Sequence, residues 1–289
     1  MQFSRITSLA AALIAIGIST ADAQCTAGTT TLIARRDFPA AKRALDLQLR
    51  ANARNDSVLH CLGTLALDTD DHEGAIEFFE KAISIAARPA HRVAMAMALR
   101  SQAQKLGMFR APPLMLRMKT EMETALAQDS SLIDAQYVLL QFYAQVPAGM
   151  GGDMAKARAH AAALLRLSPE RGHIGLGFIA EQEKNLALAD KEYRLAIGIR
   201  SDSEPPYSAA GAFYRRQERW IDAVSMYEKA ARSLPNTAFS SKIANVHYLL
   251  GNSLEKSGNE TRARAEYATA LRYKPDHADA KKALGRGDQ

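Results

Sequence analysis

The stretch that decides the fold covers residues 211–230 and reads GAFYRRQERWIDAVSMYEKA. It holds a glycine, an alanine twelve residues later, an aromatic residue four further on, and a second alanine three after that. The same pattern occurs four times, at Gly63–Ala75–Phe79–Ala82, Gly177–Ala189–Tyr193–Ala196, Gly211–Ala223–Tyr227–Ala230 and Gly251–Ala263–Tyr267–Ala270. A fixed spacing repeated in this way indicates a stacked array of structural repeats.

Each repeat is predicted to be two helices joined by a tight turn. Small residues twelve apart, such as Gly63 and Ala75, are expected where the two helix backbones come closest. The aromatic residue lies one turn further along the second helix, and we expect its ring to fill the groove against the next unit. In two copies a proline follows, at Pro235 and Pro275, and ends the second helix because it lacks a backbone N–H.

This spacing resembles that of the tetratricopeptide repeat, and the resemblance covers nearly all of the chain after its N-terminal segment. It implies an all-α protein, a right-handed superhelix of antiparallel helix pairs whose first helices line a concave groove. The alanine-rich composition, without an alternating strand pattern, independently favours an all-α fold. Because one unit cannot bury its apolar face alone, at least three units are needed for stability.

Degenerate copies fill the rest of the chain. In one, Tyr143 and Ala157 keep their places, but residues 147–153 (PAGMGGD) lengthen the turn by five. Another lies between His91 and Gln128, with a long connection expected over residues 107–113.

An N-terminal unit begins at Leu32, and its second helix is expected to open after residues 37–39. Residues 24–289 are therefore predicted to form a single array of about seven units. Residues 278–284 are expected to form a polar helix that caps the last unit.

The first 23 residues read as a secretory signal peptide. Arg5 precedes an apolar run over residues 6–18, and Ala21-Asp22-Ala23 provides a small-residue cleavage site. The run is too short for a membrane anchor. A lipid anchor on Cys25 is the rival reading, but residues 22–24 lack the leucine and small residues of a lipoprotein signal. We expect a periplasmic protein without a membrane span after cleavage.

Two cysteines, Cys25 and Cys61, remain after cleavage. An oxidising periplasm would permit a disulfide between them. The alternative is that Cys61 is a small buried side chain and Cys25 part of a frayed terminus.

The net charge of +6 is scattered in short clusters rather than gathered in a stripe with aromatic residues. This distribution gives no support for nucleic-acid binding. A mildly basic exterior would favour acidic partners or membrane surfaces, but an ordinary solvated repeat surface is the favoured explanation.

Catalytic, metal and cofactor signatures are not found. Residues 68–73 form an acidic cluster that differs from a calcium loop, because its glycine comes late and Phe79 stands where a closing carboxylate is needed. The glycine-rich run 149–152 lacks the Lys-Ser/Thr ending of a phosphate loop, and no His-Glu-x-x-His occurs. We expect neither an enzyme nor a cofactor.

The stretch 143–157, with its Pro and Gly-Gly, resembles a turn found in exported bacterial tetratricopeptide proteins. The leading hypothesis is a scaffold that binds a protein or peptide partner in the concave groove. The alternative is a small-molecule carrier or an accessory subunit of an envelope transport or assembly system. The sequence names no partner and no oligomeric state.

Eight residues are predicted to line the groove, by carrying the family's register onto this chain: His60, Thr64, Tyr137, Gln141, Phe178, Arg215, Tyr248 and Asn252. The clamp that heat-shock cochaperones use for a C-terminal carboxylate needs Lys and Asn, and only Asn252 matches. Tyr137, Tyr248 and Arg215 are the predicted hot spots, because aromatic and arginine residues dominate binding energy.

Overall fold

The computed structural model describes residues 25–107, 109–235, 238 and 240–285. The predicted signal peptide lies outside these residues. The described part contains fifteen α-helices and one short 3-10 helix: α1 (Ala27–Ala34), α2 (Phe38–Ala51), α3 (Asp56–Asp68), α4 (His72–Ile85), α5 (Pro89–Leu106), α6 (Ala111–Gln128), α7 (Ile133–Gln145), η1 (Ala148–Met150), α8 (Met154–Leu167), α9 (Pro169–Gln182), α10 (Leu186–Ile199), α11 (Glu204–Arg216), α12 (Trp220–Arg232), α13 (Ser240–Lys256), α14 (Glu260–Tyr273) and α15 (Ala278–Gly285).

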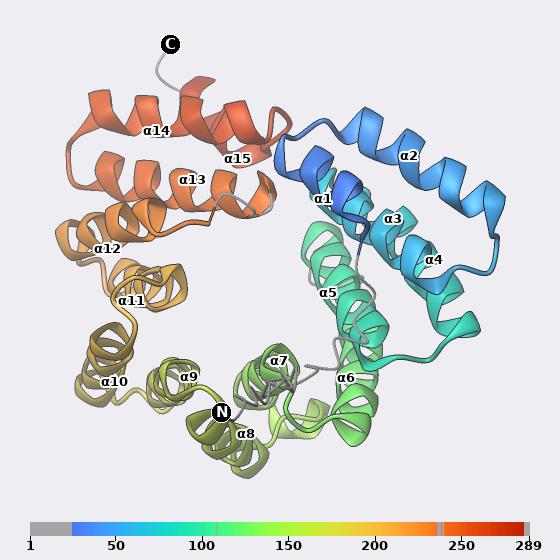
Figure 1. Ribbon diagram of the computed structural model, residues 1–289. Helices are drawn as coiled ribbons and strands as arrows, with labels where there is room; N and C mark the ends of the chain where they lie inside the picture. Colours follow the sequence, from blue (N-terminus) through green and yellow to red (C-terminus); the bar gives the residue numbers. More distant parts are fainter. Residues whose placement is uncertain (1–24, 108, 236–237, 239, 286–289) are drawn as a thin grey trace, which may run out of the picture.

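The helices pack as consecutive antiparallel pairs, which confirms the predicted all-α repeat fold. Side-chain oxygens before several helices accept backbone N–H groups of the first turn and so fix where those helices begin. These capping residues are Asp37, Asn55, Asp71, Asp153, Asn185 and Asn259. The pairs follow one another around a ring, and from α5 to α14 the first helix of each pair lies on the inner side (Figure 1).

The glycine of each repeat makes room for an aromatic ring of its own unit. A Cβ added at Gly63 would lie 2.6 Å from the ring of Phe79, and one added at Gly251 would lie 2.8 Å from the ring of Tyr267. The expectation that the glycine faces mainly the alanine twelve residues later, and the ring mainly the next unit, was therefore incomplete. The ring is larger than the alanine, so it occupies the space that the missing side chain leaves.

The two unusual connections differ from each other. The inserted turn before α8 contains η1, and Asp153 caps α8 by accepting from the N–H groups of Ala155 and Lys156. The connection before α6 is shorter than predicted, because α6 already begins at Ala111 and includes Pro112 and Pro113. Proline is tolerated in the first turn of a helix, where its missing N–H has no intrahelical acceptor.

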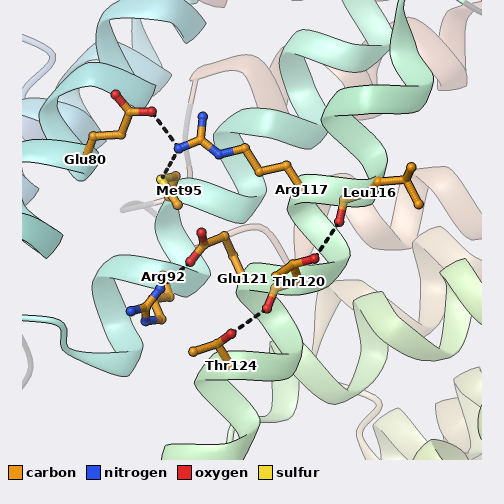
Figure 2. A network of polar contacts seen from close by, with 8 residues as sticks. All are labelled: Glu80, Arg92, Met95, Leu116, Arg117, Thr120, Glu121 and Thr124. Atoms are coloured by element: carbon orange, nitrogen blue, oxygen red, sulfur yellow. Dashed lines mark hydrogen bonds and ion pairs between the residues drawn. The ribbon is translucent and has the colours of Figure 1, made fainter.

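Ion pairs join neighbouring helices outside the apolar core. Figure 2 shows the guanidinium of Arg117 on α6, which lies 2.6 Å from Glu80 on α4 and 3.7 Å from the sulfur of Met95. In the same view Arg92 of α5 lies 2.6 Å from Glu121 of α6. Such pairs fix the rotation of one helix against another, although exposed pairs contribute little stability.

A disulfide joins Cys25 to Cys61, with 5.6 Å between their Cα atoms. Cys61 is buried on α3 in a cluster with Leu45 and Leu62. The bridge therefore ties the start of the described chain to the first apolar seam.

The two ends of the array meet and close the ring (Figure 1). The backbone N–H of Ser240, at the start of α13, donates to the carboxylate of Asp68 at 2.6 Å. Lys274, just after α14, lies 2.8 Å from Asp70. Both acids belong to the acidic cluster of residues 68–73, which spans the end of α3 and the turn before α4, so this cluster has a long-range role that the sequence did not reveal.

Arg36 completes this closing contact from the N-terminal unit. Its guanidinium donates to Ser240 Oγ and, at 3.0 Å, to the carbonyl of Ala238, and it lies 5.1 Å from the centre of the Tyr273 ring. Burial raises the pKa of Asp68, and the hydrogen bond from Ser240 and the charge of Arg36 oppose that rise. The closing contact is thus almost wholly polar.

Candidate functional site

All eight predicted groove residues lie on first helices and are half-buried. They fall on α3 (His60 and Thr64), α7 (Tyr137 and Gln141), α9 (Phe178), α11 (Arg215) and α13 (Tyr248 and Asn252). The structure separates seven of them into three groups with different surroundings, and Phe178 stands apart from these groups. Whether any of them contacts a partner stays a prediction.

The first group is a buried polar chain between α3 and α5. Nδ1 of His60 lies 3.1 Å from Nδ1 of His91, and Nε2 of His91 lies 3.0 Å from Asp56, which also pairs with Arg88 at 2.7 Å. If His91 donates to Asp56, its other nitrogen accepts from a neutral His60. Burial and the neighbouring His91 lower the pKa of His60 to about 4. His60 therefore holds two repeats together as a neutral side chain.

Thr64 does not extend this polar chain of hydrogen bonds to another helix. Its hydroxyl donates to the carbonyl of His60 at 3.0 Å. The ring of His60 meets Phe79 edge to face, with 5.3 Å between the ring centres. At the α3 end of the predicted groove, these side chains therefore mainly contact neighbouring helices.

The second group is cationic and joins α5, α7 and α9. The guanidinium of Arg171 lies 5.5 Å from the ring centre of Tyr137, and Gln141 donates to the Tyr137 hydroxyl at 3.3 Å. Burial lowers the pKa of Arg100, and the nearby Tyr137 and Asp134 oppose this effect. Arg100 forms no hydrogen bond or ion pair with the described residues. A cation so placed attracts an anionic group.

This cationic group continues onto α11. Arg216 donates to both carboxylate oxygens of Glu181, at 2.8 and 2.7 Å, and Glu181 also accepts the hydroxyl of Tyr193 at 2.5 Å. Burial and the Glu181 carboxylate raise the pKa of Tyr193. The adjacent residue, Arg215, lies beside the buried ring of Tyr227.

The third group is aromatic and lies near the end of the array. The ring of Tyr248 is 5.8 Å from Tyr267 and 5.0 Å from His277. Asn252 lies one turn further along α13, where its amide also faces Tyr267. Phe178, on α9, packs against the larger apolar core instead.

Sequence reasoning identified Tyr137, Gln141 and Arg215 but missed the arginines that surround them. Arg100 lies in a degenerate repeat, where no register could be assigned. Arg171 and Arg216 could have been found by aligning the first helices, because they occupy the same helix row as the predicted residues. In the described part of the chain, no three His, Cys, Asp or Glu side chains are grouped to hold a metal ion.

Comparison with known proteins identifies two sequence families. Residues 22–225 match the profile described as "TRAP transporter T-component", and residues 248–286 match a tetratricopeptide repeat profile. The second match confirms the resemblance drawn from the spacing. No curated protein matches this chain in sequence. Among the described helices, none has both the length and the apolarity that crossing a membrane requires.

Solved structures show the same fold at low identity. A tetratricopeptide repeat protein from Parabacteroides merdae ATCC 43184 has a TM-score of 0.58 and 17% identity, over 89% of this chain and 95% of that one. Yeast Tom70 has a TM-score of 0.58 and 16% identity, over 87% of this chain and 51% of Tom70. A chain of the APC/C hetero-tetramer Cut9–Hcn1 has a TM-score of 0.54 and 13% identity, over 89% and 48%. At these identities the likeness concerns the fold alone.

Proposed function

This chain belongs to the TRAP transporter T-component family, and we propose that it is a non-catalytic accessory subunit of a transport system in the cell envelope. The observation that carries the proposal is the family match over residues 22–225, which includes most of the repeat array. The proposal favours the accessory-subunit alternative over a general peptide-binding scaffold. We propose that the repeat array binds another component of the transporter.

The disulfide supports an extracytoplasmic location. Structural disulfides persist in oxidising compartments such as the periplasm and are rare in the cytosol. The bridge joins Cys25 to Cys61, which lie 36 positions apart in the N-terminal repeats. Together with the predicted signal peptide, it supports the proposal of a periplasmic location.

The inner row of helices is the proposed docking surface for the partner protein. From α5 to α13 the first helices share the concave side of the ring (Figure 1). Tyr137, Tyr248 and Arg215 are half-buried there. Each side chain is therefore restrained by its neighbours and still exposes surface that a partner can contact. Aromatic and arginine residues of this kind supply most of the binding energy in protein interfaces.

Affinity capture from the periplasm with chemical crosslinking tests the proposal. We expect the wild-type protein to capture another protein of the same transporter. The inner-row variant Asn252→Arg should reduce capture by about tenfold or more. The matched variant Thr269→Arg, on the outer helix α14 of the same pair, should capture normally.

Two results would argue against this proposal. Capture that excludes every transporter component would remove the accessory role. Equal capture by both variants, with unchanged helical circular dichroism, would move the docking surface away from the inner row.

A further inference from the structure

One segment of the chain carries positive charge only. Residues 81–120 contain eight lysine and arginine side chains and no aspartate or glutamate. They form the end of α4, all of α5 and the start of α6. Since the whole chain has 37 basic and 31 acidic residues, its other parts taken together are slightly acidic. The net positive charge of the protein therefore comes from this segment.

Large apolar side chains project from the same segment. Phe109, in the connection between α5 and α6, is 91% exposed, and Leu116 on α6 is 52% exposed. Pro112 and Pro113 are also exposed and lie on the helix face of Leu116, because they precede it by four and three residues. None of these four side chains belongs to an apolar cluster formed by the described residues. Their exposure is unexplained by folding of the chain alone.

The inserted turn before α8 lies at the same edge of the array. Consecutive helices run antiparallel, so the connection from α5 to α6 and the one from α7 to α8 emerge on one side. The ring of Tyr143, at the end of α7, has the ammonium of Lys119 on α6 5.6 Å from its centre and that of Lys156 on α8 at 5.2 Å. Met150, in the inserted turn, is 60% exposed. Both connections thus place an exposed apolar side chain beside cations.

Neighbouring acids leave cations at this edge available. Lys105 and Arg110 are exposed and form no ion pair with a described residue. Arg117 does pair with Glu80 at 2.6 Å, and the side chain of Leu116 points away from that pair (Figure 2). Exposed apolar side chains next to lysine and arginine are the features by which a peripheral protein binds an anionic membrane.

We infer that this edge of the array docks on an anionic phospholipid surface. Its docking residues are Lys105, Phe109, Arg110, Leu116 and Met150. Phe109 enters the boundary between headgroups and acyl chains with Leu116 and Met150 beside it, while Lys105 and Arg110 contact the phosphates. Charge complementarity points to lipid, since phosphatidylglycerol supplies the negative charge that this segment lacks. The inference rests on the proposed location in the cell envelope and on no protein partner.

Vesicle flotation tests this docking. The protein is purified from the periplasm, and mass spectrometry verifies that residues 1–23 are gone, because an apolar signal peptide would itself bind lipid. We expect binding to vesicles of phosphatidylglycerol and phosphatidylethanolamine but not to vesicles of phosphatidylcholine. Sodium chloride at about 0.5 M should release most of the protein by screening. Absence of binding to the anionic vesicles, or equal binding to both kinds, overturns the inference.

Four variants locate the docking surface. Phe109→Ser and Arg110→Glu should each weaken binding to the anionic vesicles by about tenfold or more. Leu47→Ser is the matched apolar control, because Leu47 is 64% exposed on α2. Arg54→Glu is the matched charge control, in the exposed turn before α3. Both controls should bind as wild type does, and helical circular dichroism should be the same for all four. If the controls weaken binding as much as the other two, the surface lies elsewhere and the inference is wrong.

Fluorescence distinguishes insertion from surface attraction. Trp220 is the single tryptophan of the chain, so Phe109→Trp combined with Trp220→Phe places the only indole at the docking edge. Its emission should shift to the blue on anionic vesicles and be quenched by brominated lipids. Unshifted, unquenched emission from the bound protein would overturn the insertion of Phe109.

A protein partner is the competing explanation for this edge. If vesicles do not bind, yet Phe109→Ser lowers crosslinked capture of a transporter protein, the edge docks a protein and the membrane inference is overturned. The vesicles contain no protein, so their result leaves the proposed accessory role to be judged by capture alone.

Discussion

The seams between successive repeats and the contact that closes the ring are built from different chemistry. Within the array, fully buried rings such as Phe79 and Tyr227 press against glycine backbones. At the closing contact Asp68, Arg36 and Lys274 carry the interaction, and residues from the two ends of the array are brought together. Apolar contacts of this kind supply most folding stability, whereas polar contacts exchange one hydrogen bond for another with water.

This difference in chemistry indicates which part of the ring can open. In a repeat array the stability is roughly a sum over neighbouring units, so the seams are needed for folding. Separating the two ends would expose a few polar groups that water can solvate. We therefore expect the ring to open at the closing contact well before any repeat unfolds.

The largest effect is expected from breaking a seam with Gly211→Leu. A Cβ at this position already lies 3.0 Å from the ring of Tyr227, and a leucine would force the two helices apart. Overpacking of this severity should lower the free energy of unfolding by about 3 kcal/mol. Urea denaturation followed by circular dichroism measures the loss.

Gly198→Leu is the matched control for this substitution. Gly198 also lies within a helix, α10, but an added Cβ there meets no atom within 4 Å. Leucine at this site should be neutral or slightly stabilising, because glycine is a poor helix former. Equal destabilisation by both variants would show that the glycine positions do not define the seam.

The next effect concerns the contact between α3 and α5, where His60 lies against the buried side chain of His91. His60 has a pKa of about 4 in the folded chain against 6.5 in the unfolded chain, so the unfolded chain takes up its proton first as the pH falls. The stability that His60 contributes is present above pH 6.5 and is lost between pH 6.5 and 4. From pH 7 to pH 5 the loss should be about 2 kcal/mol.

Urea midpoints at pH 7 and pH 5 test this dependence. His91, whose pKa is also lowered mainly by burial, adds a loss in the same direction, and Asp56 and Arg88 are the other charged groups that face the pair. His60→Gln keeps a polar side chain that does not titrate and should show a clearly smaller loss. If the variant and the wild type lose equal stability, the titrating group is elsewhere.

The seams were predictable from the sequence because each depends on residues at a fixed short distance. The spacing from Gly211 to Tyr227 identified both helices and the contact between them. The closing contact was not predictable, since Asp68 and Ser240 belong to no common local pattern. The site shows both cases: Arg215 was predicted from the repeat register, whereas Arg100 was missed because it lies in a degenerate repeat where no register could be assigned.

The smallest expected effect on stability comes from breaking the closing contact with Asp68→Ala. The substitution removes the acceptor for the Ser240 N–H and the partner of Arg36. If the ends separate, water satisfies both groups, so the free energy of unfolding should fall by only about 1 kcal/mol. The shape should change far more than the stability, because the two ends are no longer held.

Small-angle X-ray scattering measures that change as an increase in the radius of gyration. Asp46→Ala is the matched control, because Asp46 pairs with Lys42 at 2.9 Å within the single helix α2 and takes no part in closure. Wild type in high salt should move partly toward the opened shape, since Lys274–Asp70 and Arg36–Asp68 are weakened by screening. A variant that keeps the wild-type radius but loses 3 kcal/mol or more would contradict the comparison. The closing contact would then behave as another seam, and the ring would be a single cooperative unit rather than an array with joined ends.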